Sequence, residues 1–403
     1  MLFDPARHET PCGDAWDAAR ASDAIVSIVD HVQSALGPDG TTWPLHPLDD
    51  DGDTPPGGFK GLYLGSAGVW WSLWALARRG CAPSRLDPAA GIARTLAAYL
   101  DGPDTGSVVP SYFLGEVGVR LVHWRLTGDT AGLDALAAAV ERNVDNPTLE
   151  ALWAAPGTML AAWHLGRVTG EARWSALLER NVEFLWQTWQ RHDDAGAWLW
   201  TQDLYGRRRR LLGAAHGFAG NVYALLRDPQ ALGAARLDTL VDRCAETLQA
   251  TAIDDGDAST WPPAAEPTPP GRMPLMQWCH GAPGIVTALA DLPPGRSPAL
   301  DRLLRRAGEA VWRAGPLAKG PGLCHGTAGN GYAFLKLYRR DGDPQWLERA
   351  RAFAMHAIRQ VEAMRAAHGL ARCTLWTGDL GVAHYLADCR EGTADWPSLD
   401  TLD

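Results

Sequence analysis

The amino-acid sequence predicts an all-α protein built as an α/α toroid, a double ring of seven inner and seven outer helices. Three observations predict this fold class. The chain is 46% hydrophobic and rich in Ala and Leu, whereas β-branched residues are sparse, which favours helices over sheet. A four-residue turn of the form Gly-x-x-Gly recurs seven times, each time ahead of an apolar run. Amphipathic segments of helical period lie between these turns.

The recurring turns mark the expected starts of the inner helices. A single Gly-x-x-Gly carries almost no information, but seven of them, spaced by about forty to sixty-five residues, indicate a repeated helix hairpin. The third turn departs from the pattern, because Ala154 replaces the first glycine and Pro156 stiffens the turn, which leaves its geometry open. The turns span residues 65–68, 115–118, 154–157, 217–220, 281–284, 326–329 and 378–381.

The amphipathic segments between the turns are predicted to form the outer ring, because their charged faces suit contact with water. Examples are residues 88–100, 131–143, 172–192 and 344–363. Seven inner helices bury their apolar faces better in a closed ring than in a linear stack, so we expect one domain over residues 1–403 with the glycine turns gathered at one end. Three stretches rich in Pro, Gly and Asp are predicted as surface loops or lids, at 44–59, 101–109 and 254–274.

Charge and cysteine content exclude several classes of protein. A net charge of −10 disfavours nucleic acid or an anionic membrane as the main partner. The arginine run 207–210 is the exception, and we interpret it as a solvated loop in preference to a site for an acidic partner. No apolar run reaches membrane-spanning length and no secretory signal is evident, so we expect a cytoplasmic protein. Seven cysteines, an odd number, fit reduced thiols better than a disulfide framework.

Two cysteines and a histidine predict a metal site. Cys279 and Cys324 precede the fifth and sixth turns at equivalent positions, so the repeat should bring them to neighbouring turns, and His325 follows Cys324. Two sulfurs and an imidazole suit zinc, and three protein ligands leave one tetrahedral position open for chemistry. Zinc in such a site would lower the pKa of an incoming thiol, which favours sulfur transfer. Hydrolysis by a zinc-bound water stays open as an alternative.

Three further residues are candidates for proton transfer. His216 precedes the fourth turn at the position equivalent to His280 and His325, so it should lie near the same cavity and act as an acid or base. His280 is either a second acid or a side chain that points away from the cavity. Glu150, four residues ahead of the third turn, is either an orienting or proton-transferring carboxylate or a helix cap.

Four strings of the sequence resemble the lanthionine synthetase C family, and most closely its LanC-like members. They are AHGFAG at 215–220, WCHGAPG at 278–284, GLCHGTAGNGYAFL at 322–335 and GDLGVAHYLADC at 378–389, and the resemblance extends over essentially the whole chain. The resemblance implies an α/α toroid with zinc on Cys279, Cys324 and His325. It also implies that the histidine at position 216 is the acid or base and that Glu150 is an acidic residue of the site.

The resemblance further implies the reaction and the partners. Peptide cyclases of the family add a peptide cysteine to dehydroalanine or dehydrobutyrine, whereas LanC-like proteins add glutathione to dehydroamino acids in proteins. The expected partners are therefore a peptide or protein that contains dehydroamino acids and, on the strength of the LanC-like strings, glutathione. The repeats occupy the whole chain, so a separate dehydratase, kinase or lyase must supply the dehydroamino acid.

Two positions bear on the choice of thiol. Lys319, one of only three lysines, resembles a glutathione-contacting lysine of the LanC-like branch. The segment 372–376 looks shortened where LanC-like proteins carry an arginine and acidic residues that bind glutathione. Arg372 would fill the arginine role, but no acidic partner is evident in the sequence.

Two rival functions come from other classes. A non-catalytic zinc-containing protein that binds glutathione or a peptide would need the metal site but no general acid. A carbohydrate-active α/α toroid would use paired carboxylates and tryptophans that stack on the sugar. The chain has nineteen tryptophans in all. The cysteine pair has no purpose in that second alternative, so thioether formation by a zinc-dependent enzyme is the leading interpretation.

Overall fold

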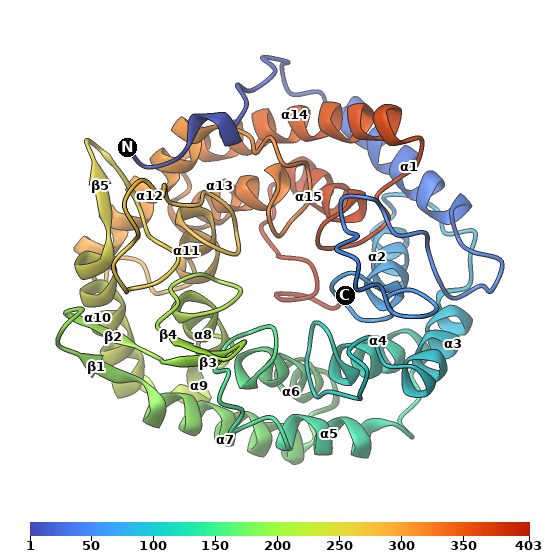
Figure 1. The fold of residues 1–403 in the computed structure, drawn as a ribbon, viewed down its shortest axis with the longest axis horizontal. Helices are drawn as coiled ribbons and strands as arrows, with labels where there is room; N and C mark the ends of the chain where they lie inside the picture. The colour runs from blue at the N-terminus through green and yellow to red at the C-terminus, as the bar shows by residue number, and fades with distance from the viewer.

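The computed structural model describes residues 1–403 and arranges 15 α-helices as two concentric rings around a common centre (Figure 1). Each inner helix contacts the next inner helix, and α15 contacts α2, which closes the ring. The predicted toroid of seven inner and seven outer helices is confirmed. The inner ring consists of α2 (Ser66–Arg78), α4 (Glu116–Thr127), α6 (Ala155–Thr169), α8 (Phe218–Leu225), α11 (Ala282–Leu289), α13 (Thr327–Asp341) and α15 (Asp379–Glu391).

The outer helices bury one face against the inner ring and expose the other. In α12, for example, Leu304 and Val311 are buried while Arg302 is exposed, whereas every residue of α11 is buried. The outer ring consists of α1 (Ala18–Ser34), α3 (Pro88–Asp101), α5 (Leu133–Glu141), α7 (Ala172–Thr188), α10 (Ala234–Thr251), α12 (Pro298–Ala314) and α14 (Pro344–His368). The short α9 (Pro229–Leu232) and a 3-10 turn at Pro5–Arg7 complete the helices. None of the helices combines the length and the apolarity that a bilayer crossing requires.

Three small antiparallel hairpins interrupt the helical pattern, and the sequence pattern did not predict them. They are β1 (Gln190–His192) with β2 (Ala197–Leu199), β3 (Gln202–Leu204) with β4 (Arg207–Arg209), and β5 (Ile253–Asp255) with β6 (Ala258–Thr260). The arginine run is therefore a strand and not an irregular loop, and the predicted loop 254–274 starts within a hairpin. Strands of three residues are too short to show an alternating pattern. The β3–β4 turn depends on positive φ at Tyr205 (52°) and Gly206 (70°).

The glycine turns have one shared role at the N-terminal ends of the inner helices. The first residue of each turn is the N-cap of its helix. The fourth residue packs against the carbonyl oxygen six positions earlier, so that a Cβ added at Gly329 would lie 1.7 Å from the oxygen of Leu323. The third turn keeps this geometry, because the φ and ψ of Ala154 (−115° and −167°) match those of Gly65 (−112° and −176°).

The close approach predicts a large loss of stability for Gly329→Ala. The added methyl group would overlap a backbone oxygen that cannot swing aside, and we expect the free energy of unfolding to fall by about 3 kcal/mol or more. Urea unfolding followed by circular dichroism measures the change. Gly166→Ala in α6 is the matched control, because its added Cβ meets Trp174 at an ordinary 3.5 Å and should stabilise the helix by about 0.5–1 kcal/mol. Equal midpoints for the two variants would contradict the packing role of the turns.

The C-terminal segment runs from α15 into the centre of the ring (Figure 1). Trp396 is buried there and stacks on Trp278, with ring centroids 5.1 Å apart. Asp400 forms ion pairs with Lys336 at 2.7 Å and Arg227 at 2.5 Å, and all three side chains are almost completely buried. The C-terminal segment thereby occupies the middle of the toroid. It packs against Trp278, the residue directly before Cys279.

Candidate metal and acid–base site

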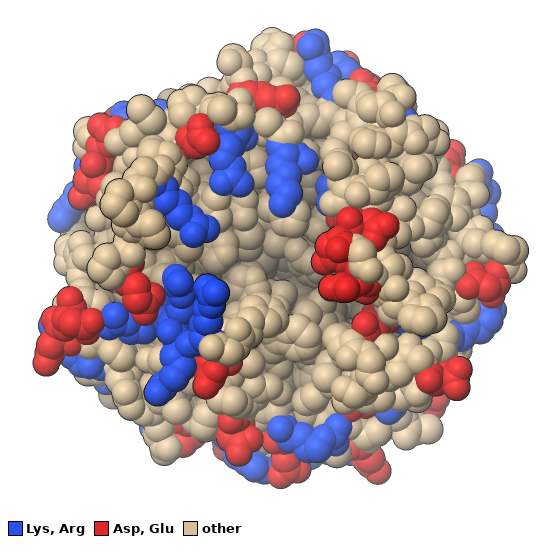
Figure 2. All heavy atoms as spheres, viewed as in Figure 1, with Lys and Arg blue, Asp and Glu red and all other residues tan.

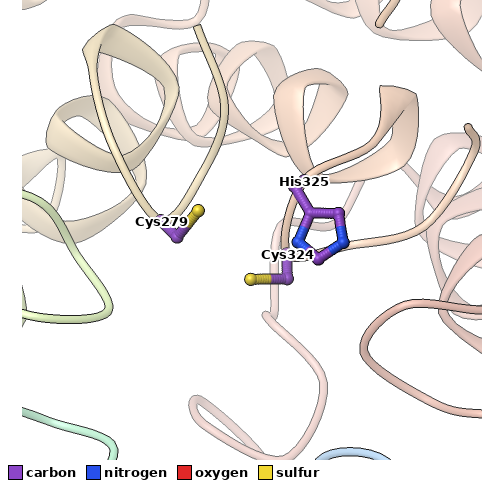
Figure 3. A group of neighbouring side chains, drawn as sticks. All are labelled: Cys279, Cys324 and His325. Carbon is purple, nitrogen blue, oxygen red and sulfur yellow. The ribbon is translucent and has the colours of Figure 1, made fainter. Parts of the chain in front are cut away.

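Cys279, Cys324 and His325 lie together at the glycine-turn end of the toroid (Figure 3). Cys279 stands ahead of α11, and the other two residues stand ahead of α13. Their ligand atoms all lie within 4.8 Å of one another. The backbone N–H of Cys279 donates to the carbonyl of Cys324 at 3.2 Å, which ties the two turns together. The repeat thus brings residues that are 45 positions apart in sequence into one cluster.

The surroundings of the two cysteines suit a bound cation. Both side chains are buried, with 8% and 4% of their surface exposed. The hydrogen bond between the thiols lowers the pKa of Cys279 well below its ordinary value, in spite of burial, and raises the pKa of Cys324. Gln277 donates to the Cys279 sulfur at 2.9 Å, and the Tyr63 hydroxyl contacts Cys324. Two sulfurs and one imidazole, close enough to share an ion, fit zinc.

Glu150 and His216 form a hydrogen-bonded pair beside this cluster. The Nδ1 atom of His216 lies 2.8 Å from a carboxylate oxygen of Glu150, whose side chain is completely buried. The same carboxylate accepts from the backbone N–H groups of Leu152 at 3.1 Å and Trp153 at 2.6 Å. Glu150 therefore caps the turn that precedes α6 and not the helix itself, and it also orients the imidazole. With Nδ1 directed at Glu150, Nε2 is the ring nitrogen left for a substrate.

The two neighbouring imidazoles have opposite pKa shifts. Burial acts to lower the pKa of His216, but the Glu150 carboxylate outweighs burial, so the pKa of His216 is raised. Burial lowers the pKa of His280, whose ring stacks on His216 at 5.8 Å and whose Nδ1 is buried without a hydrogen-bond partner. His216 is therefore the imidazole that keeps a proton to higher pH and has one to deliver, and His280 is the imidazole that stays neutral.

The two predicted substrate-binding residues differ in exposure. Lys319 is exposed in the segment that leads to Cys324. Arg372 is buried, and its guanidinium donates through Nε and Nη2 to the carboxylate of Asp49, with an Nε to Oδ2 distance of 2.8 Å. The ion-pair partner of Arg372 is Asp49, which comes from the predicted lid 44–59, where the sequence showed no motif. The ion pair anchors that loop and does not involve Nη1 of Arg372.

A family model described as lanthionine synthetase C-like protein matches residues 60–401. Glutathione S-transferase LANCL1 from Danio rerio is 33% identical over 198 residues, which cover 47% of this chain and 44% of that protein. LanC-like protein GCL1 from Arabidopsis thaliana is 39% identical over 156 residues, which cover 38% of this chain and 34% of that protein. The matched stretches thus span less than half of the length of these curated relatives.

Among solved structures, nisin cyclase has a similar fold. It superposes with a TM-score of 0.60 over 93% of this chain and 95% of its own, at 14% sequence identity. This likeness supports the toroidal arrangement of both rings.

Proposed function

The chain belongs to the lanthionine synthetase C-like family, and from this premise we propose that it is a zinc-dependent enzyme that forms thioethers. In this proposal a thiol of glutathione or of a peptide cysteine adds to the β-carbon of dehydroalanine or dehydrobutyrine in a peptide or protein. The observation that carries the proposal is the Glu150–His216 pair next to the Cys279, Cys324 and His325 cluster. A site that only bound metal would have no use for an oriented proton donor.

Cys279, Cys324 and His325 would hold the metal with three ligands, which leaves one position for a substrate thiol. When bound, zinc lowers the pKa of such a thiol, so that a thiolate exists at neutral pH. Both cysteines are buried, which limits the access of water to their sulfurs.

Protein side chains then transfer the two protons of the addition, one from the thiol and one to the substrate. The thiol loses its proton, and His280, which burial keeps neutral, has a free ring nitrogen lone pair to accept it. The new carbon–sulfur bond leaves the substrate as an enolate, and Nε2 of His216 delivers a proton to its α-carbon. Glu150 holds His216 in the tautomer and orientation that this delivery requires. One proton is released and one is taken up, so the step needs neither oxidant nor reductant.

Recognition of the thiol is assigned to the basic residues near Cys324. Lys319 is exposed and free to contact a carboxylate of glutathione, and Arg372 offers its Nη1 beside the Asp49 ion pair. In this proposal a separate dehydratase, kinase or lyase supplies the dehydroamino acid.

The proposal is tested with two dehydrated peptides and the zinc-loaded protein. A peptide with dehydroalanine and no cysteine should gain the mass of one glutathione, and a peptide with both groups should lose its alkylatable thiol without added glutathione. Which product forms faster identifies the thiol substrate. A protein that carries zinc and accelerates neither reaction above the background without enzyme would refute the proposed function.

A further inference from the structure

The hairpin formed by β3 and β4 carries a net positive charge, because its three arginines outnumber its one carboxylate, Asp203, which lies opposite Arg208. Arg207, Arg208 and Arg209 are all exposed, and none of them lies within ion-pair distance of a carboxylate. Arg210 differs, because Asp194 at 2.8 Å and Glu266 at 3.1 Å neutralise it. A run of three unpaired arginines stands out in a chain whose net charge is −10. Their exposed positive charges are free to interact with a partner outside the chain.

Backbone and side-chain contacts fix this hairpin next to the Glu150–His216 pair. The N–H of Asp203 donates to the carbonyl of Pro147 at 3.0 Å, and the amide of Gln202 donates to the carbonyl of Leu149 at 3.3 Å. These carbonyls belong to the turn that presents Glu150. On the other side, β4 leads directly into the turn of His216. The basic hairpin and the acid–base pair are thus parts of one continuous structure.

The strand register directs two of the arginines toward the site. Gln202 pairs with Arg209, and Leu204 pairs with Arg207, and residues directly opposite each other project from the same face. Gln202 is buried against the turn of Glu150, so Arg207 and Arg209 lie on the face that borders the site.

The tip of the same hairpin offers an aromatic contact. Tyr205 is 74% exposed, and its hydroxyl accepts a hydrogen bond from Trp153 at 3.0 Å. An exposed tyrosine held in place by a second aromatic side chain gives a peptide backbone a rigid apolar surface at low entropic cost. The hairpin therefore combines positive charge with an exposed aromatic surface.

The opposite side of the same face has the opposite charge. Figure 2 shows basic side chains grouped on one side of the central hollow and acidic side chains grouped on the other. Asp50, Asp51 and Asp53 are exposed in the lid 44–59, which lies across the ring from the hairpin (Figure 1). The acidic side would repel a long polyanion such as nucleic acid. The basic side, at the hairpin, can bind a short run of acidic residues.

We propose that the β3–β4 hairpin, with Tyr205 and Arg207 to Arg209, docks an acidic segment of the peptide substrate. The segment would hold the peptide at the mouth of the toroid while a dehydroamino acid further along its chain enters the site. Arginine forks pair with carboxylates in bidentate geometry, so a run of Glu or Asp is the matching ligand. The identity of this ligand as the substrate rests on the proposed function, whereas its binding to the hairpin does not.

The test uses two fluorescein-labelled peptides that differ only in a run of four Glu or four Gln. Fluorescence anisotropy should show the Glu peptide binding about tenfold more tightly at about 0.05 M salt, with the difference vanishing at about 0.5 M as screening shortens the range of the charges. The variant R207Q/R208Q/R209Q should lose the preference. R78Q/R302Q/R390Q is the matched control, because it removes three exposed charges elsewhere and should keep the preference.

Three outcomes would overturn the docking surface. They are equal affinity of the wild type for both peptides, an unchanged preference in the hairpin variant, and tighter binding of a DNA duplex of equal charge. A circular dichroism melt of the hairpin variant checks that it folds. The Cys279→Ala variant separates the two proposals, because it should keep its preference for the Glu peptide whether or not thioether formation occurs.

Discussion

Replacing Cys279 with alanine is expected to reduce bound zinc from about one ion per chain to nearly none. Only three protein ligands are available, and a pair of one cysteine and one histidine cannot hold the ion against a competing chelator. Elemental analysis after dialysis against a weak chelator measures the loss. Thioether formation should fall with the metal content, because the substrate thiol is then no longer activated.

Cys81→Ala provides the matched control for this measurement. Cys81 is as buried as Cys279, at 8% exposure, but its thiol hydrogen-bonds to a backbone carbonyl and it belongs to no cluster of metal ligands. The variant should retain full zinc content. A well-folded wild-type protein that contains no zinc and takes up none on addition would end the case for thiol activation, and equal zinc in both variants would remove Cys279 from the site.

The ring of helices could be predicted from the sequence because its signal repeats. The turns recur in the same relation to apolar runs, and each repeat supports the interpretation of the others. At the third turn, whose geometry the sequence left open, Ala154 adopts the same extended conformation as Gly65, which any residue can adopt. Gly157, the fourth residue of that turn, is retained because an added Cβ would lie 2.0 Å from a backbone oxygen.

The partners of the site residues could not be predicted in the same way. Cys279 and Cys324 occupy equivalent repeat positions, so their meeting follows from the architecture. Asp49 and Tyr63 reach the site from the irregular segment that precedes the first turn, whose course depends on contacts that no periodic pattern records. Gln277 lay two residues from a predicted ligand, and a search for side chains able to donate to a thiolate would have found it.

Replacing His216 with alanine is expected to lower turnover by about 10² to 10⁴-fold, the usual contribution of a positioned general acid. Zinc content and the affinity for the thiol should stay unchanged, because His216 is not one of the clustered ligands. A loss of turnover without a loss of zinc or of thiol affinity distinguishes the enzyme from a zinc-containing binding protein. Single-turnover assays with a dehydrated peptide, alongside zinc analysis, measure both. Unchanged turnover in the zinc-loaded variant would assign proton delivery to another group.

Glu150→Gln tests how the proton donor is tuned. The carboxylate raises the pKa of His216 against the lowering effect of burial, so the protonated imidazole persists to higher pH than it would without Glu150. Activity that depends on this protonated form falls as the pH rises through the raised pKa. Gln removes the charge and leaves burial to dominate, so the alkaline limb of the pH–rate profile should move to lower pH.

The control for that profile is Glu141→Gln on α5, where the carboxylate is exposed and paired with Arg180 on the surface. It makes the same chemical change far from the site and should leave the profile in place. A limb that moves to higher pH in Glu150→Gln, or that does not move, would mean that His216 acts as a base or takes no part in the rate. The Glu150 carboxylate also accepts hydrogen bonds from two backbone N–H groups, so the free energy of unfolding of Glu150→Gln should fall by about 1–3 kcal/mol. The pH–rate profile is therefore best recorded well below the melting temperature of the variant.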